Sequence, residues 1–393
     1  MTEVWALAAV WLSLALVAGA LAMWLRISSA MAEVVIGTLA QLVLAATIGS
    51  GALGTDEPWV KFLSGVGVML LTFLAGAELE PAVLKLKWKE AVSLGSVSFL
   101  VPFFICAAIS HYVLGWGVMP SWLAGVALGG TSVAVIYTEM MQHGLNGTGF
   151  GKTLLGACFV TDLGNVVALG LIFSPFTFRT VIFVVATAVG CVALAKFTPR
   201  LFKMFGARPS EFETKFLLVA LLALGSLATW AESEAVLPAY IIGMTLANAV
   251  GKDHALIRRL RTVTFGVLTP FFFIRAGYLV SIPAIVTAPI AFLALLLGKV
   301  AAKSLAVYPV SRFFGSPHVE GMYSALLMSS GLAFGAIASL YGLSHGIIDR
   351  SQYSVLVGAV IASGIIPTMV ASNFFVPHHL LPKAKSAELP EGE

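Results

Sequence analysis

Apolar residues dominate this chain in long runs that are separated by short polar turns. The hydrocarbon core of a bilayer is about 30 Å thick, and a helix needs about 20 apolar residues to cross it. Lipid offers the backbone no hydrogen-bond partners, so such runs fold as helices. The pattern therefore predicts an all-α polytopic membrane protein with about thirteen transmembrane helices. They are expected near residues 4–24, 32–51, 59–78, 91–114, 120–141, 151–174, 178–197, 214–231, 236–251, 264–282, 286–309, 321–343 and 353–376.

The composition excludes most other classes of protein. Of the 393 residues, 59% are hydrophobic and only 11% are charged, with a mean hydropathy of +0.96. Soluble domains carry about 25% charged residues, so an ordinary soluble enzyme, a disordered protein and a nucleic-acid binder are all excluded. Cys106, Cys158 and Cys191 lie inside apolar runs, which argues against a disulfide framework or a cysteine metal site. No catalytic triad or phosphate-binding loop is evident, so we expect neither enzymatic activity nor a resident cofactor.

The basic residues predict the orientation of the chain in the membrane. Of the 23 Lys and Arg, only Lys61, Arg179 and Arg350 fall on one side of the predicted helices. The positive-inside rule then places the N-terminus outside and the C-terminus in the cytoplasm. Topology thus explains the basic loops, and no nucleic-acid partner is expected. The seventeen basic residues of the other side are Arg26, Lys85, Lys87, Lys89, Lys152, Lys196, Arg200, Lys203, Arg208, Lys215, Lys252, Arg258, Arg259, Arg261, Arg312, Lys383 and Lys385.

A few ionisable residues fall within the membrane-spanning runs, where such residues are functional-site candidates. Asp162 lies at the middle of the sixth run, and Lys299 and Lys303 share one helix face in the eleventh. A buried carboxylate can hold a cation or a proton in turn, which is what an exchanger requires. The alternatives are a structural ion pair between Asp162 and a lysine, or a lysine that extends to the interface. The other ionisable residues in these runs include Arg275, Glu139 and Glu33.

Two runs are interrupted by small and polar residues. Gly129-Gly130-Thr131-Ser132 lies inside the fifth run, and Ser329-Ser330-Gly331 lies inside the twelfth. Such interruptions predict discontinuous helices around a site at the bilayer midplane, although small residues also serve close helix packing. Runs four to six and eleven to thirteen then form two inverted repeats, each with a broken helix at its centre.

Together these features predict an ion site at the two breaks. Asp162 would bind the transported Na⁺ or K⁺ or a proton, and either Lys299 or Lys303 would compensate its charge. This arrangement favours a cation/proton antiporter. The alternatives are a sodium-coupled symporter of organic anions, in which Arg275 would meet the anion, and a membrane sensor without coupled transport. The neutral oxygen ligands would come from Thr131, Ser132, Thr161 and Asn165, next to the second break at Ser329, Ser330 and Gly331.

Several motifs, in order along the chain, resemble those of one transporter family. The chain is similar to the monovalent cation:proton antiporters of the second bacterial family, which comprises NapA-type sodium/proton antiporters and Kef-type potassium/proton antiporters. The similarity runs through nearly all of residues 1–376. The motifs that carry it are Glu33–Gly37, Phe73–Leu79, Gly130–Ala134, Phe159–Asn165, Leu268–Gly277 and Ser329–Phe334.

This resemblance implies an architecture and a site. It implies a thirteen-helix membrane domain over residues 1–378, a short cytoplasmic tail at 379–393, a homodimer and an elevator movement. The dimerisation part would comprise about 1–84 and 178–282, and the mobile core part about 85–177 and 286–376. Asp162 falls on the family's cation- and proton-binding aspartate.

Departures from the family pattern refine the expectation. Thr161 stands where electrogenic members carry Asp and Kef-type members carry Gln, so electroneutral exchange is expected. Leu332 replaces the acidic residue of Kef-type members, and no nucleotide-binding regulatory domain is expected. The family's core lysine is either Lys303, by its distance from Ser311–Gly315, or Lys299, by its depth relative to Asp162.

Overall fold

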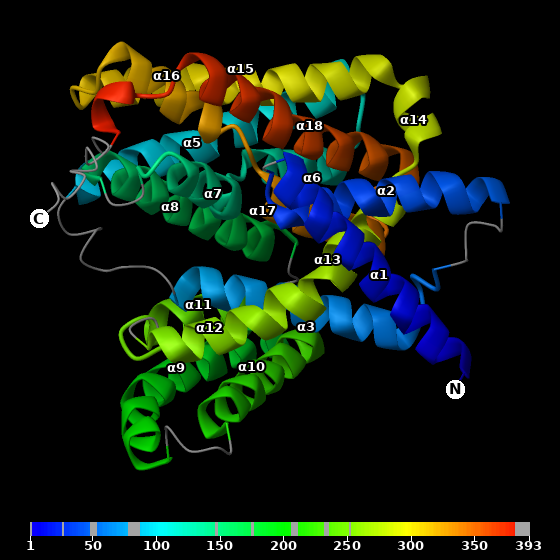
Figure 1. Ribbon diagram of the computed structural model, residues 1–393, viewed down its shortest axis with the longest axis vertical. Helices are drawn as coiled ribbons and strands as arrows, with labels where there is room; N and C mark the ends of the chain where they lie inside the picture. The colour runs from blue at the N-terminus through cyan, green and yellow to red at the C-terminus, as the bar shows by residue number, and fades with distance from the viewer. Residues whose placement is uncertain are drawn as a thin grey trace, which may run out of the picture.

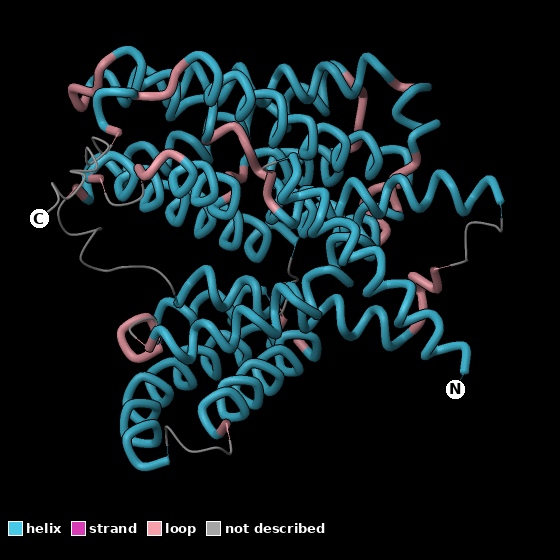
Figure 2. Tube along the Cα trace, viewed as in Figure 1, coloured by secondary structure: helices cyan, strands magenta, loops and turns pink. Residues whose placement is uncertain are grey.

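A computed structural model gives the arrangement of the chain, and every regular element in the part it describes is helical (Figure 2). The structure describes residues 2–25, 27–47, 53–77, 87–145, 148–173, 177–205, 211–231, 236–250 and 253–381. Glu78 and Leu79 of the motif Phe73–Leu79 lie outside the described residues, as does the tail beyond residue 381. So do the basic residues Arg26, Lys85, Arg208, Lys252, Lys383 and Lys385.

The helices pack in two groups, one mainly in the lower part and one mainly in the upper part of Figure 1, with the two N-terminal helices (dark blue) between them. In the first group, α3 packs on α11, and α13 packs on α2 and α3. Its elements are α1 (Thr2–Leu25), α2 (Ser29–Thr47), α3 (Pro58–Ala77), α9 (Phe178–Phe205), α10 (Phe212–Trp230), α11 (Val236–Leu246), α12 (His254–Val263), η2 (Thr264–Leu268) and α13 (Thr269–Tyr278).

The second group contains the helices that carry the predicted ion site. Here α5 packs on α6, α8 and α15, while α18 packs on α15, α16 and α17. Its elements are α5 (Trp88–Ala108), η1 (Ile109–Val113), α6 (Val118–Gly129), α7 (Val133–Gln142), α8 (Gly149–Phe173), α14 (Ile282–Thr287), α15 (Pro289–Phe313), α16 (His318–Leu327), α17 (Leu332–Ser344), α18 (Arg350–Phe374) and η3 (His378–Leu380).

The predicted fold class is confirmed: the protein is an all-helical, multi-pass membrane protein. Helix is present in each of the thirteen predicted runs. Within the described residues, nine helical segments are long and apolar enough to cross a bilayer, so the count of thirteen remains a prediction.

The largest difference from the predicted boundaries is at α12, which begins about ten residues before the predicted run. The Asp253 carboxylate caps it by accepting from the backbone N–H groups of Ala255 and Leu256, at 3.1 and 3.0 Å. This helix buries Leu256 and Leu260 and exposes Arg258 and Arg259. An amphipathic helix of this kind has no long apolar run, so the hydropathy pattern alone misses it.

Glycines allow close helix contacts in the first group. A Cβ atom placed on Gly76 of α3 would lie 2.5 Å from the Tyr240 carbonyl oxygen of α11. On the other side of the same crossing, a Cβ on Gly243 would collide with the Phe73 carbonyl. The two backbones therefore meet directly, as small residues permit in membrane helices.

A small number of hydrogen bonds join the two groups. The Tyr240 hydroxyl of α11 donates to the Phe159 carbonyl of α8 at 3.0 Å. The Tyr353 hydroxyl of α18 donates to the Ala276 carbonyl of α13 at 2.6 Å. Both bonds reach a main-chain oxygen of the other group, so they hold the second group against the first in this conformation.

Candidate ion-binding site

The two predicted helix breaks are present, and they cross each other. The α6 helix ends at Gly129 and α7 begins at Val133, with Gly130 in an extended conformation (φ −64°, ψ 160°). The α16 helix ends at Leu327 and α17 begins at Leu332. At the crossing, the Ser132 backbone N–H donates to the Ser330 carbonyl across 2.7 Å.

Close approach at this crossing explains a glycine in the second break. A Cβ atom on Gly331 would lie 2.5 Å from the Gly130 carbonyl oxygen, well inside van der Waals contact. Thr131 adds a side-chain link, because its hydroxyl donates to the Met328 carbonyl at 3.1 Å. The breaks are therefore held together by main-chain and side-chain bonds.

Asp162 is buried on α8 beside this crossing. The residue is 3% exposed, and its Oδ1 atom has no hydrogen-bond partner. Asn165 follows one helical turn later, and both polar atoms of its amide also lack a partner. The Asn165 Nδ2 atom lies 2.6 Å from the position that a Cβ on Gly130 would take, which places the amide at the break. Buried polar atoms without partners are uncommon and indicate a place for a ligand or water.

The two buried lysines of α15 have different surroundings. The Lys303 ammonium donates to Thr131 Oγ1 at 2.7 Å and to Ser98 Oγ at 3.0 Å, and its charge interacts with Asp162. The Lys299 ammonium has no hydrogen-bond partner and lies 2.6 Å from the position of a Cβ on Gly331. Both side chains are fully buried, so neither extends to the membrane interface. Among the described residues no ion pair within 4.0 Å joins either lysine to Asp162.

Two of the three hydroxyl groups predicted as cation ligands, those of Thr161 and Thr131, already make hydrogen bonds. The Thr161 hydroxyl donates to the carbonyls of Ala157 and Gly95, at 3.0 and 3.2 Å. Thr131 Oγ1 accepts from the ammonium of Lys303, and an oxygen that faces an ammonium is a poor ligand for another cation. Among the described residues at the crossing, Asp162 Oδ1 and the amide oxygen of Asn165 are buried acceptors that have no hydrogen-bond partner.

Sequence reasoning missed Ser98 of α5, which is fully buried and holds Lys303. A single serine in an apolar run carries no periodic signal. Only the packing of α5 against α15 brings its hydroxyl to the lysine.

Two other buried acidic residues, Glu139 and Glu33, make no contact with Asp162 or Lys303 among the described residues. Glu139 of α7 accepts from the Ser372 hydroxyl and from the Tyr323 hydroxyl at 3.5 Å. Its Oε1 atom also lies 3.3 Å from His143 Nδ1, which hydrogen-bonds to the Glu139 backbone carbonyl at 3.0 Å. Its carboxylate thus joins α7 to α16 and α18 and has a structural explanation. Glu33 of α2 is buried with its Oε2 atom unpartnered.

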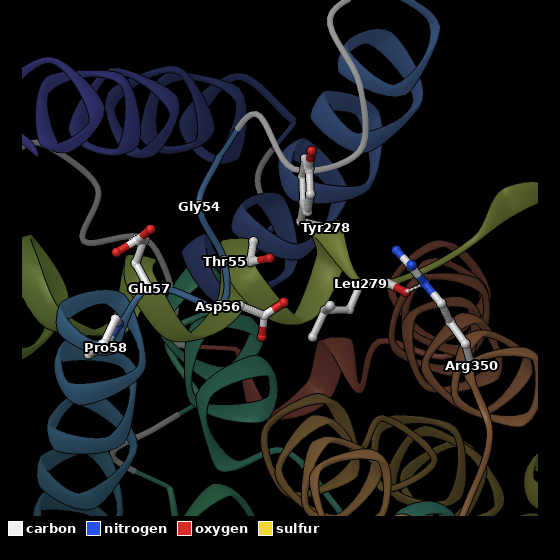
Figure 3. Close-up of a pocket in the computed structure, with 8 residues that line it drawn as sticks. All are labelled: Gly54, Thr55, Asp56, Glu57, Pro58, Tyr278, Leu279 and Arg350. Atoms are coloured by element: carbon white, nitrogen blue, oxygen red, sulfur yellow. Dashed lines mark hydrogen bonds between the residues drawn. The ribbon is translucent and has the colours of Figure 1, made fainter. Parts of the chain in front are cut away.

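In the symporter alternative Arg275 would contact the anion. The structure instead places its side chain against the segment that precedes α3. Its Nε donates to the Thr55 carbonyl at 2.9 Å, and its charge interacts with Asp56. Next to Arg275 is a cavity of about 420 Å³ between the two helix groups (Figure 3). At its edge the Arg350 guanidinium donates to the Leu279 carbonyl at 3.4 Å. The cavity is lined by Gly54, Thr55, Asp56, Glu57, Pro58, Tyr278, Leu279 and Arg350.

A helical membrane protein with two crossed broken helices and a buried carboxylate beside them has the architecture of a secondary transporter. The chain belongs to the family described as sodium/hydrogen exchanger, transmembrane, which matches residues 12–375.

Individual relatives agree with this membership. The chain is 24% identical over 342 residues to a probable Na⁺/H⁺ antiporter 3 of Methanocaldococcus jannaschii, covering 84% of this chain and 87% of that one. It is 25% identical over 342 residues to the glutathione-regulated potassium-efflux protein KefC of Klebsiella pneumoniae, covering 83% of this chain but only 54% of KefC. The sodium/proton antiporter MjNhaP1 of Methanocaldococcus jannaschii has the same fold, with a TM-score of 0.72 at 17% identity over 95% of this chain and 99% of that one.

Proposed function

We propose that the protein exchanges a monovalent cation, Na⁺ or K⁺, for H⁺ across the membrane by alternating access. The observation that carries this proposal is the buried Asp162 carboxylate with an unpartnered oxygen, beside two crossed helix breaks. One relative is named a probable Na⁺/H⁺ antiporter and another a potassium-efflux system protein, and both names support the transport of a monovalent cation.

In this mechanism Asp162 alternates between two states. The ionised carboxylate and the amide oxygen of Asn165 offer hard oxygen ligands to an alkali cation. A proton on the same carboxylate removes the negative charge and releases the cation. Because one group serves both ligands in turn, their exchange is coupled.

The stoichiometry follows from the number of carboxylates. Thr161 is the neighbour of Asp162 on α8, and it carries a hydroxyl rather than a second acid. One carboxylate that carries either one proton or one cation gives one-for-one exchange, which is electroneutral.

The larger-scale features are carried over from the family. We propose a homodimer in a bacterial inner membrane with the N-terminus outside and the C-terminus in the cytoplasm. The group that contains α5–α8 and α15–α18 would move against the other group as an elevator. The organic-anion symporter has no structural support, because Arg275 is bound to the Thr55 carbonyl.

Proton flux in proteoliposomes tests the proposal. The purified protein is reconstituted with an internal pH dye, and Na⁺, K⁺ or Li⁺ is added outside, with and without a clamped membrane potential. We expect cation-dependent proton movement that is insensitive to the potential and is lost in Asp162→Asn. Asp349→Asn, at an exposed helix cap where Asn serves as well as Asp, is the matched control and keeps full flux. Substantial exchange in Asp162→Asn would overturn the assignment.

A further inference from the structure

In the part of the chain that the structure describes, two neutral hydroxyl groups, and no carboxylate, accept hydrogen bonds from the buried ammonium of Lys303. Thr131 Oγ1 lies 2.7 Å and Ser98 Oγ 3.0 Å from Lys303 Nζ. These hydroxyls come from α6–α7 and α5, and the lysine comes from α15, so three helices meet at one ammonium group. Asp162 is close enough to interact with this charge but makes no ion pair with it.

The hydroxyl of Thr131 is oriented for this task. It donates its own hydrogen to the Met328 carbonyl at the end of α16. Its lone pairs therefore remain for the ammonium, and Thr131 must act as the acceptor. Ser98 Oγ completes the pair at 3.5 Å from Thr131 Oγ1, and all three side chains are buried. A buried ammonium is costly unless acceptors surround it, so the two hydroxyls allow Lys303 to remain buried without an ion pair to Asp162.

The alternative partner of the Lys303 ammonium is the carboxylate of Asp162, which is also the proposed ligand of the transported cation. A lysine side chain has four flexible methylene groups, so Lys303 can bond to the hydroxyl pair or turn to Asp162. When it pairs with Asp162, it competes with the transported cation for the same oxygens. When it rests on Ser98 and Thr131, the carboxylate is available.

We propose that Ser98 and Thr131 form a neutral resting place for the Lys303 ammonium, and that Ser98 is thereby a positioning residue for cation binding at Asp162. This inference rests on the proposed antiport and adds a residue that sets its cation affinity. Ser98 never touches the substrate. It acts by keeping a competing internal cation off the carboxylate.

Removing the Ser98 hydroxyl shifts Lys303 toward Asp162 and so weakens cation binding. Loss of one hydrogen bond to a charged group changes the equilibrium between the two positions of Lys303, at the hydroxyl pair and at Asp162, by about tenfold. We expect Ser98→Ala to raise the KM for the transported cation about tenfold, with the maximal rate within twofold of the wild type. Ser98→Thr, which restores a hydroxyl, should return the KM toward the wild-type value.

The experiment measures KM and maximal rate by proton flux in proteoliposomes for the wild type, Ser98→Ala, Ser98→Thr and Ser98→Cys. The Cys variant keeps the side-chain volume but offers only a weak acceptor, so it still gives an answer if Ser98→Ala fails to fold. Ser110→Ala is the matched control. This serine is also fully buried, on the helical run that continues α5, but its hydroxyl donates only to the Cys106 carbonyl at 2.8 Å.

A second arm separates positioning from a general structural effect. Apparent cation affinity is measured from the rise in Tm with NaCl or KCl relative to choline chloride, which needs no turnover. In the Lys303→Met background, Ser98→Ala should change this affinity less than twofold, because the competing ammonium is gone. An equal loss of affinity in both backgrounds, or an unchanged KM in Ser98→Ala and Ser98→Cys, overturns the inference. Absence of cation-dependent flux in the wild type would instead contradict the antiport itself.

Discussion

The backbone N–H of Ser132 donates to the carbonyl of Ser330 across 2.7 Å, although the two residues are far apart in the chain. The bond joins the breaks of two discontinuous helices directly, main chain to main chain. A displacement of either break must therefore move the other or rupture a buried hydrogen bond. The site beside them is consequently sensitive to any change that separates the two backbones.

Gly331→Ala tests this close approach. The added Cβ would lie 2.5 Å from the Gly130 carbonyl oxygen and 2.6 Å from Lys299 Nζ, so the breaks must separate. We expect a loss of transport and a stability loss of about 1–3 kcal/mol, as is typical of overpacking. Gly65→Ala is the control, because a Cβ there meets nothing within 4 Å. Unimpaired flux and Tm in Gly331→Ala would show that the crossing tolerates a wider spacing.

The two lysines should respond in opposite directions to replacement by methionine. Lys299 has no hydrogen-bond partner, so an apolar side chain of similar length removes an uncompensated buried charge. Lys299→Met is therefore expected to raise the free energy of unfolding by about 1–3 kcal/mol. Lys303→Met should lower it, because Asp162 loses the charge that interacts with it and two hydroxyls lose their bonds.

Thermal unfolding in detergent measures both effects, and monodispersity on size exclusion is checked first. Equal Tm shifts of the same sign would contradict the distinction between the lysines.

Adding a second carboxylate should change the stoichiometry. Thr161 is fully buried next to Asp162, and its hydroxyl is bonded only within α8 and to Gly95 of α5. In Thr161→Asp two acids can each carry a proton, so more than one proton can exchange for a single cation. Exchange should then respond to a clamped membrane potential, whereas Thr161→Ser should remain insensitive. A potential-insensitive Thr161→Asp that still transports would contradict the link between carboxylate number and electrogenicity.

The sequence predicted the breaks and the buried aspartate because both have local signals. Glycine and serine interrupt an apolar run at Gly130 and Gly331, and Asp162 is the only acid in the middle of its run. The sequence alone did not distinguish Lys299 from Lys303, since they share one face of one helix. Their difference comes from the neighbouring helices, which supply hydroxyls to Lys303 and none to Lys299. Tertiary contacts of this kind have no counterpart in periodicity.

Glu139 gives the last prediction, because its carboxylate joins three helices away from the proposed ion site. It accepts from Ser372 and from Tyr323, lies 3.3 Å from His143 Nδ1, and is buried. Glu139→Gln removes the charge and half of the acceptor capacity, and a loss of about 2 kcal/mol in stability is expected for hydrogen bonds to a charged group.

The matched control is Glu320→Gln, since that carboxylate bonds to His379, which is half exposed. We expect a clearly larger fall in Tm for Glu139→Gln than for Glu320→Gln. The KM for the cation should be unchanged in both, because neither carboxylate contacts Asp162 or the lysines. A raised KM in Glu139→Gln with an unchanged Tm would mean that this residue belongs to the ion pathway rather than to the frame that supports it.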